Sequence, residues 1–151
     1  KANSVQQNIK EIQKMILKTF WKSISYFVFI AILSIIPNSK LEKFDIERIY
    51  NFQIFLDKIE HAIAFFIFSF LFWYDFKKQN KYLFLKNYSL LFSIIFSFTI
   101  GILIEIVQEY ISIIDRTGNI LDFYSNNIGI ILFVFLFFVF RNFIYRISKI
   151  E

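Results

Sequence analysis

Hydrophobic and polar residues follow one another along this chain in long blocks, with four mainly apolar segments separated by short charged stretches. A helix of about 20 apolar residues crosses the hydrocarbon core of a bilayer, and a helix satisfies its backbone polar groups internally. The pattern therefore predicts an all-α integral membrane protein, an antiparallel bundle of four transmembrane helices. We expect these helices at about residues 19–36, 57–76, 88–114 and 124–147.

The residues ahead of the first apolar segment, 1–18, have a different pattern. Apolar residues recur there at helical spacing from Val5 to Ile16, and lysines stand between them. Such a segment is typical of an amphipathic helix that lies on the membrane surface beside the first span. A helix that binds a protein partner is the alternative. The chain then divides into this interfacial segment, 1–18, and a transmembrane domain, 19–147.

The second apolar segment carries charge where it begins. Its uncharged run, 62–74, is too short to cross a bilayer, so the helix has to extend back to about Asp57. The first turns of this helix then contain Asp57, Lys58 and His61. Asp57 and His61 share a face because they are four residues apart. Charged groups at such a position either serve a function or cap and pair within the helix.

The third and fourth segments add polar residues at the ends that face each other. Glu105 is an ionisable group inside the third helix, which usually marks function or pairs internally. It shares one helical face with Gly101 and Gln108, and a glycine lets another helix approach closely. Asp122 and Asn126 share a face at the start of the fourth helix. Polar faces of three helices can thus converge within the bundle.

Composition agrees with a membrane protein and excludes several chemistries. Hydrophobic residues make up 57% of the chain, 23 residues are Phe and none is Cys. Because the chain has no Cys, disulfides and thiolate metal sites are excluded. The Phe side chains are expected to face lipid or to pack in the bundle. The net charge of +5 comes from cations beside apolar segments. Cations in this position are typical of contact with anionic membrane lipids, so we expect lipids as partners and no nucleic acid.

The distribution of cations predicts an orientation. Lysines and arginines gather before the first apolar segment, in the expected short loop at 75–86, and from Arg141 to the last residue, which places both termini in the cytoplasm. The polar residues at the start of the second helix and around the connection between helices three and four then lie at one depth on the extracytoplasmic side. The predicted pocket residues are Asp57, Lys58, His61, Glu105, Gln108, Arg116, Asp122 and Asn126.

These residues allow several kinds of chemistry. His61 with Asp57 has the arrangement of a general acid/base pair, and Glu105 could act as a second acid/base group after burial. The same groups together with Asp122 could supply metal ligands, but no recognised ligand spacing is present, so no metal is expected. P-loop and dinucleotide-binding glycines are absent as well, and no cofactor is expected. A polar cluster that only locks the bundle is the structural alternative.

Several short motifs follow one another along the chain. They are Ser34-x-x-Pro37, then Asp57-Lys58-x-x-His61-x-x-x-Phe65, then Gly101-x-x-x-Glu105-x-x-Gln108, and then Arg116, Asp122, Asn126 and Gly129. Each motif is weak alone, and their order on successive helices makes the set specific. Together they resemble the motifs of the VanZ-like membrane protein family over about Ser34–Gly129.

The resemblance implies a small multi-pass protein of the bacterial cytoplasmic membrane, in a family named for a protein associated with reduced susceptibility to the glycopeptide teicoplanin. The leading hypothesis is a protein that binds or handles an anionic envelope lipid or a polyprenyl-linked cell-wall precursor. Lys58 and Arg116 would contact phosphate, and the other pocket residues would form hydrogen bonds. The alternatives are a membrane enzyme that acts on a lipid head group and a structural or partner-binding membrane protein.

Overall fold

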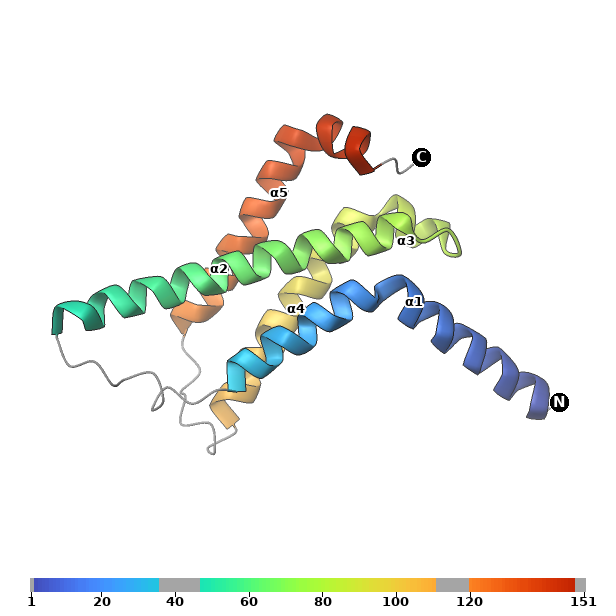
Figure 1. The fold of residues 1–151 in the computed structure, drawn as a ribbon, viewed down its shortest axis with the longest axis horizontal. Coiled ribbons are helices and arrows are strands. Elements are labelled where there is room, and N and C mark those ends of the chain that lie inside the picture. Colours follow the sequence, from blue (N-terminus) through green and yellow to red (C-terminus); the bar gives the residue numbers. More distant parts are fainter. Residues whose placement is uncertain (1, 36–46, 111–119, 149–151) are drawn as a thin grey trace.

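The computed structural model describes residues 2–35, 47–110 and 120–148, and the regular structure in these ranges is entirely α-helical (Figure 1). The prediction of an all-α chain is thereby confirmed for these residues. The helices are α1 (Ala2–Ile35), α2 (Glu47–Lys78), α3 (Leu83–Asn87), α4 (Ser89–Tyr110) and α5 (Ile120–Ser148).

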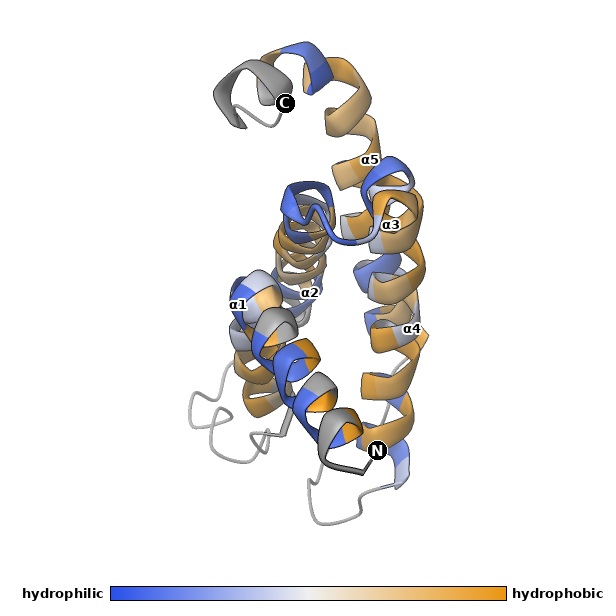
Figure 2. Ribbon diagram, turned by 90° about the vertical axis from the view of Figure 1, so that its right-hand side faces the viewer, coloured by the Kyte–Doolittle hydropathy of each residue, from blue (hydrophilic) through white to orange (hydrophobic). Residues whose placement is uncertain are grey.

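Helix α1 joins the amphipathic segment to the first apolar segment. The two were expected as separate elements, at 1–18 and 19–36, but the helix continues from one to the other and bends by 55° between Lys14 and Leu17. No Gly or Pro lies between Ala2 and Ile35, so the local sequence has no strong helix breaker. In Figure 2, hydrophilic and hydrophobic residues both occur along the part of α1 that follows the N-terminus.

Helix α2 extends beyond the predicted segment at both ends, from Glu47 to Lys78. The predicted connection after it, 75–86, is therefore shorter than expected, and part of it forms the short helix α3. A side-chain clamp holds the remaining turn, because Gln79 donates to the carbonyl of Tyr82 at 2.6 Å and accepts from its N–H at 2.8 Å. This turn brings α4 back along α2.

Among the described residues, two helices are long and apolar enough to cross a membrane, α4 and the part of α5 from Ile120 to Phe143. The bent helix α1 is a third candidate if its two parts count as one span. Large apolar side chains on α4 and α5 are exposed in the isolated chain, as lipid contact requires. They include Leu91, Ile95, Leu103, Ile131 and Phe135. These helices indicate a membrane protein.

Helices α2 and α5 run in the same direction, as their contacts show. Lys58 lies about three turns into α2, not in its first turns as expected, and it meets Asp122 in the first turn of α5. The Phe66 ring packs on the Phe133 ring further along both helices. Where they are closest, α2 and α5 are in backbone contact. A Cβ placed on Gly129 would lie 2.1 Å from the Ala62 carbonyl oxygen, so only glycine fits there.

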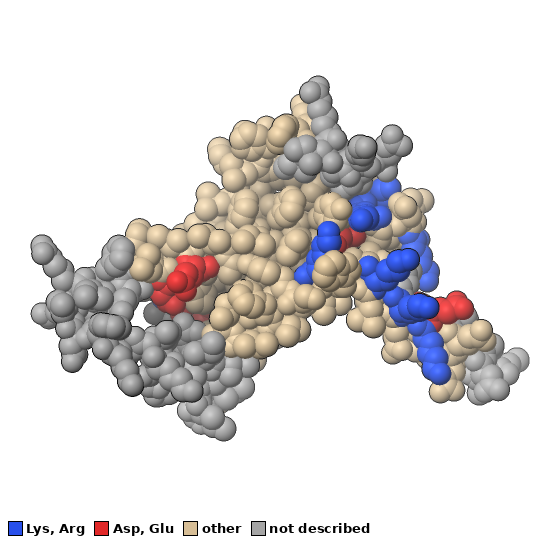
Figure 3. Space-filling view, in the orientation of Figure 1, with Lys and Arg blue, Asp and Glu red and all other residues tan. Residues whose placement is uncertain are grey.

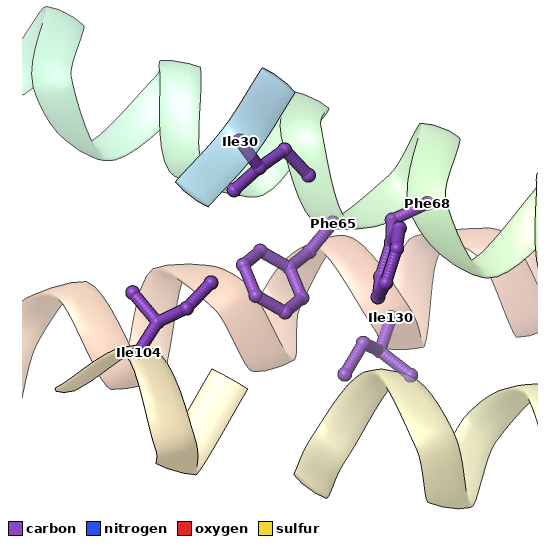
Figure 4. Packing of buried hydrophobic residues seen from close by; sticks show 5 residues of the cluster. All are labelled: Ile30, Phe65, Phe68, Ile104 and Ile130. Atoms are coloured by element: carbon purple, nitrogen blue, oxygen red, sulfur yellow. The ribbon is translucent and has the colours of Figure 1, made fainter. Parts of the chain in front are cut away.

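Helices α1 and α4 run antiparallel to α2. Along α4, Ser97 bonds to Ser69 of α2, and the later residue Gly101 lies on Phe65, which is earlier in α2. All four long helices contribute to one apolar core cluster (Figure 4). Its buried members are Ile30, Phe65, Phe68, Ile104 and Ile130. The polar side chains described next lie on the same helices, in the first half of α2 and the first turns of α5.

Candidate functional site

An ion pair between helices forms the outer part of the candidate site. The Lys58 ammonium of α2 binds the carboxylate of its neighbour Asp57 at 2.9 Å and also binds the carboxylate of Asp122 on α5. An ammonium has three N–H donors, so one lysine can bind both carboxylates at once. The described geometry therefore makes Lys58 a bridge between two carboxylates rather than a free cation.

A chain of hydrogen bonds forms the inner part and connects α2, α5 and α4. His61 Nδ1 of α2 lies 3.0 Å from Asn126 Oδ1 of α5. Asn126 Nδ2 in turn donates to Glu105 Oε1 of α4 at 3.2 Å. The Asn126 amide is the middle member, and it is 1% exposed. A buried amide that bonds on both sides couples the imidazole to the Glu105 carboxyl group.

This chain of bonds also assigns the imidazole tautomer. An amide has one donor group and one acceptor atom, and the Asn126 Nδ2 donor is directed at the Glu105 carboxyl group. Its Oδ1 acceptor is therefore left for His61, so Nδ1 carries the hydrogen in this contact. The other ring nitrogen, Nε2, faces Asp57 Oδ1 at 3.9 Å. In the neutral imidazole, Nε2 is thus the atom that can accept a proton.

Exposure of the side chains falls from Asp57 to Asn126. The side chain of Asp57 is 31% exposed, those of Lys58 and His61 are 19% and 13% exposed, and Asn126 at the inner end is almost fully enclosed. A molecule that approaches from the start of α2 would therefore meet Asp57, Lys58 and His61 first. Glu105 accepts a bond from the Asn126 amide on the side of α4 and is itself partly exposed.

Close helix packing explains why these side chains meet. Gly129 lies one turn after Asn126 and allows α5 to touch the α2 backbone at Ala62, the residue after His61. Gly101 lies one turn before Glu105 and packs on the Phe65 ring, with the Asn126 Cβ also within ordinary contact distance of a Cβ at this position. The two glycines therefore set the spacing between helices that the hydrogen bonds require.

Three side chains of this network also have the spacing of metal ligands. Asp57, His61 and Asp122 each offer a ligand atom, and these atoms lie within 4.8 Å of one another. However, Lys58 already binds both carboxylates, so the chain supplies its own cation at this position. The geometry therefore allows the two carboxylates to be neutralised by Lys58 without a metal.

The other predicted site residues fall in different places. Gln108 is buried, 3% exposed, on the α4 face that also carries the buried residues Gly101 and Ile104. Arg116 lies outside the described residues, so its predicted place in the pocket stays a prediction. The described chain therefore brings together six of the predicted residues, namely Asp57, Lys58, His61, Glu105, Asp122 and Asn126.

A second buried polar contact, which the sequence pattern does not predict, lies at the far end of α2. Asp75 is 2% exposed, and its Oδ2 accepts hydrogen bonds from the backbone N–H and the hydroxyl of Ser23 on α1, at 3.2 and 2.6 Å. The sequence predicts a short loop from residue 75, whereas Asp75 lies within α2. Its signal in the sequence was that it is a lone acid beside Lys77 and Lys78.

The chemistry available to the network is acid–base chemistry and hydrogen bonding. It contains three carboxyl groups, one imidazole, one amide and one ammonium from three helices.

Comparison of the chain with models of protein families, with curated proteins and with solved structures finds no match. The resemblance to the VanZ-like family therefore stays a prediction, and it rests on the motifs of the chain.

Proposed function

We propose that this chain is a VanZ-like multi-pass membrane protein that binds or handles the head group of an envelope lipid or a lipid-linked cell-wall precursor. The observation that carries the proposal is the polar network shared by α2, α4 and α5, in which the Asn126 amide joins His61 to Glu105. Ionisable groups between apolar helices are costly to bury, and they are usually kept for function or for internal pairing.

The membrane arrangement that fits this function has four spans, in α1, α2, α4 and α5. We count α2 as a span because it packs against the spans α4 and α5 in the shared apolar core. Lys58 and Lys78 are 20 residues apart on α2, and this separation corresponds to about 30 Å of helix, close to the thickness of the hydrocarbon core. The network and the lysine-rich end of α2 would then lie at opposite membrane surfaces.

The lysine distribution supports a location in the bacterial cytoplasmic membrane with both termini in the cytoplasm. Lysines surround the end of α2 and the bend of α1, whereas acidic side chains gather near the beginning of α2 (Figure 3). Cytoplasmic loops carry the excess of Lys and Arg, so the network would face the extracytoplasmic side. A cell-wall precursor or a lipid of the outer leaflet would reach it there, which agrees with a role in teicoplanin susceptibility.

The charges within the network favour particular parts of a head group. Its carboxyl groups outnumber the Lys58 ammonium, so hydroxyl, amide or ammonium groups of a sugar, peptide or lipid would bind to Asp57 and Asp122. A phosphate of the same molecule would contact Lys58 and Arg116, at the cost of competing with the two carboxylates. Glu105 would hold the orientation of Asn126.

A membrane enzyme is the second candidate, and the position of His61 favours it. Its Nδ1 is held by Asn126, and its Nε2 faces Asp57 and lies on the more exposed side of the network. An imidazole held in one tautomer with the other nitrogen accessible is suited to general base catalysis. This candidate requires that turnover of a lipid head group is lost in His61→Ala. Turnover that survives in both His61→Ala and Glu105→Gln would exclude it.

The third candidate is a purely structural network. Each of the two links, Lys58 with Asp122 and Asn126 with Glu105, connects two helices without any ligand. If the cluster only locks the bundle, Glu105→Leu should fold, and no bound molecule should be lost with the polar group.

The decisive experiment is native mass spectrometry of the protein extracted gently from its own membrane, beside Glu105→Gln and His61→Ala. Thr99→Val is the matched control, because Thr99 is on the exposed face of α4 and its hydroxyl bonds only to the Ile95 carbonyl of its own helix. A head-group-bearing lipid retained by the wild type and Thr99→Val and depleted in both other variants would support binding at the network. The same lipids in all four proteins would count against it and favour the enzyme or the structural candidate.

A further inference from the structure

A second polar site lies at the other end of the bundle, between α1 and the last turns of α2. It is a cavity of about 350 Å³ that is open on one side, and its lining includes four lysines from two separate stretches of the chain. These are Lys18 and Lys22 on α1, and Lys78 and Lys81 at and after the end of α2. Figure 3 shows the same concentration of positive charge at this end of the molecule.

Buried hydrogen bonds hold the walls of this cavity in place. The Asp75 carboxylate accepts from both the N–H and the hydroxyl of Ser23, which ties α2 to α1 directly beside Lys22. On the other wall, the Gln79 side chain closes the turn to Tyr82. The cavity is therefore built from fixed backbone, and its lysine side chains start from defined positions. Preformed sites of this kind lose less conformational entropy when a ligand binds.

The cavity is strongly biased toward anions. Its lining has four ammonium groups against the single carboxylate of Asp75, which is buried and already bonded to Ser23. Within the described part of the chain, no carboxylate forms a salt bridge with these four lysines. Two of them instead lie over the face of the Tyr74 ring, Lys22 at 4.8 Å and Lys78 at 5.6 Å from its centroid. Tyr74 thus brings ammonium groups from both walls close together.

The position of the cavity points to the head-group layer of a membrane. Its lining includes Tyr74, where the apolar run of α2 ends, and Trp21 of α1, which is 58% exposed, and Trp and Tyr are enriched at the membrane–water boundary. On its other side, α1 bends by 55° immediately before Lys18, and the segment beyond the bend exposes apolar side chains such as Ile9 and Ile12 beside lysines. A segment with this composition is suited to lie on a lipid surface.

We propose that this cavity binds a phosphate group through Lys18, Lys22 and Lys78, as part of an anionic phospholipid head group or of a soluble phosphate ester. Ammonium groups are charge-assisted donors to phosphate oxygens, and three of them from two helices can surround one phosphate. Asp75 is a positioning residue that holds α1 against α2. This site is separate from the network at the beginning of α2, so it does not depend on the function proposed there.

The test is native mass spectrometry of the full chain in detergent, titrated with phosphatidylglycerol and, separately, with phosphatidylcholine. We expect the wild type to prefer phosphatidylglycerol and Lys22→Gln/Lys78→Gln to bind it about tenfold more weakly, because two charge-assisted contacts are lost. Lys10→Gln/Lys14→Gln is the control with the same change in net charge, since both side chains are exposed on α1 outside the cavity. It should bind like the wild type.

Two further measurements complete the test. Lys22→Arg/Lys78→Arg should restore the preference, and Lys18→Gln, an exposed change that leaves the helix contacts intact, should weaken binding by itself. Loss of bound phosphatidylglycerol on addition of millimolar inorganic phosphate would assign the site to phosphate in general. Retention would assign it to the lipid. Equal weakening in the control pair and the cavity pair, or no preference for phosphatidylglycerol in the wild type, would overturn the proposal.

Discussion

Lys58 of α2 forms an ion pair with Asp122 of α5, a residue 64 positions further along the chain. The pair closes the outer end of a polar network whose inner end is the Asn126 bond to Glu105. Since each link joins two different helices, the network should contribute to both the stability of the bundle and the geometry of any site within it. The two contributions can be separated by substitution.

Removal of the Lys58 charge should destabilise the protein more than removal of an exposed charge. Lys58→Met leaves Asp57 and Asp122 close together without their shared cation, and we expect a loss of about 2–4 kcal/mol in the free energy of unfolding. Lys58→Met/Asp122→Leu should recover part of this loss, because it removes one of the unpaired carboxylates. Thermal unfolding in detergent measures both. Lys10→Met, an exposed control, should change stability by less than about 0.5 kcal/mol.

The two glycines of the network should respond differently to the same substitution. Gly129→Ala would place a methyl group 2.1 Å from the Ala62 carbonyl oxygen, so the helices have to separate, at a cost of about 1–3 kcal/mol or more. Gly101→Ala meets the edge of the Phe65 ring at 3.3 Å and the Asn126 Cβ at 3.8 Å, with no backbone in the way, and the gain in helix propensity, up to about 1 kcal/mol, should offset these contacts. Equal melting temperatures for the two variants would contradict the described packing of α5 on α2.

His61 allows a direct test of the hydrogen-bond chain, because it is the only histidine in the sequence. In protein labelled with ¹⁵N-histidine, we expect the neutral ring to carry its hydrogen on Nδ1, the nitrogen that faces Asn126. Asn126→Leu removes the acceptor at nearly constant volume and should shift the ring toward the other tautomer. Ser125→Ala is the control, since the Ser125 hydroxyl bonds to Leu121 of its own helix. An unchanged tautomer in Asn126→Leu would exclude the proposed coupling.

The proposed orientation can be tested by chemical labelling, because the chain has no native cysteine. Single cysteines at Lys81, in the turn after α2, and at Thr117, in the connection between α4 and α5, are offered to a reagent that does not cross membranes. We expect labelling from outside at Thr117 and protection at Lys81, since the lysine-rich turn should face the cytoplasm. The reverse pattern would invert the orientation and place the network on the cytoplasmic side.

Several features of the fold could be predicted from the order of residues. Helical class and the apolar segments follow from composition and run length, because a helix satisfies its own backbone in lipid. The spacing of Asp57 and His61 put them on one face of α2, and they do face each other at 3.9 Å. The rise of a helix fixes the depth of each residue along it, so polar groups near the start of α2 and α5 could be expected at one level.

The exact ends of the helices and the contacts between helices were harder to predict from the sequence. The start of α2 at Glu47 and the continuity of α1 through its bend were missed, because sequence patterns that mark a membrane boundary need not interrupt a helix. The Asp75 contact with Ser23 was also missed, since these residues are 52 positions apart and neither has a distinctive motif. The basic cavity beside them arises only when α1 and the end of α2 are brought together.

The sequence by itself determined that this chain is helical, that its helices are apolar enough for a membrane, and which polar residues share a helical face, because all three depend on neighbours within a few turns. The tertiary structure alone decided that Lys58 bridges two carboxylates, that Asn126 joins His61 to Glu105, and that Gly129 touches the α2 backbone. These depend on how helices rotate and approach one another, which is set by packing between residues that are distant in the chain.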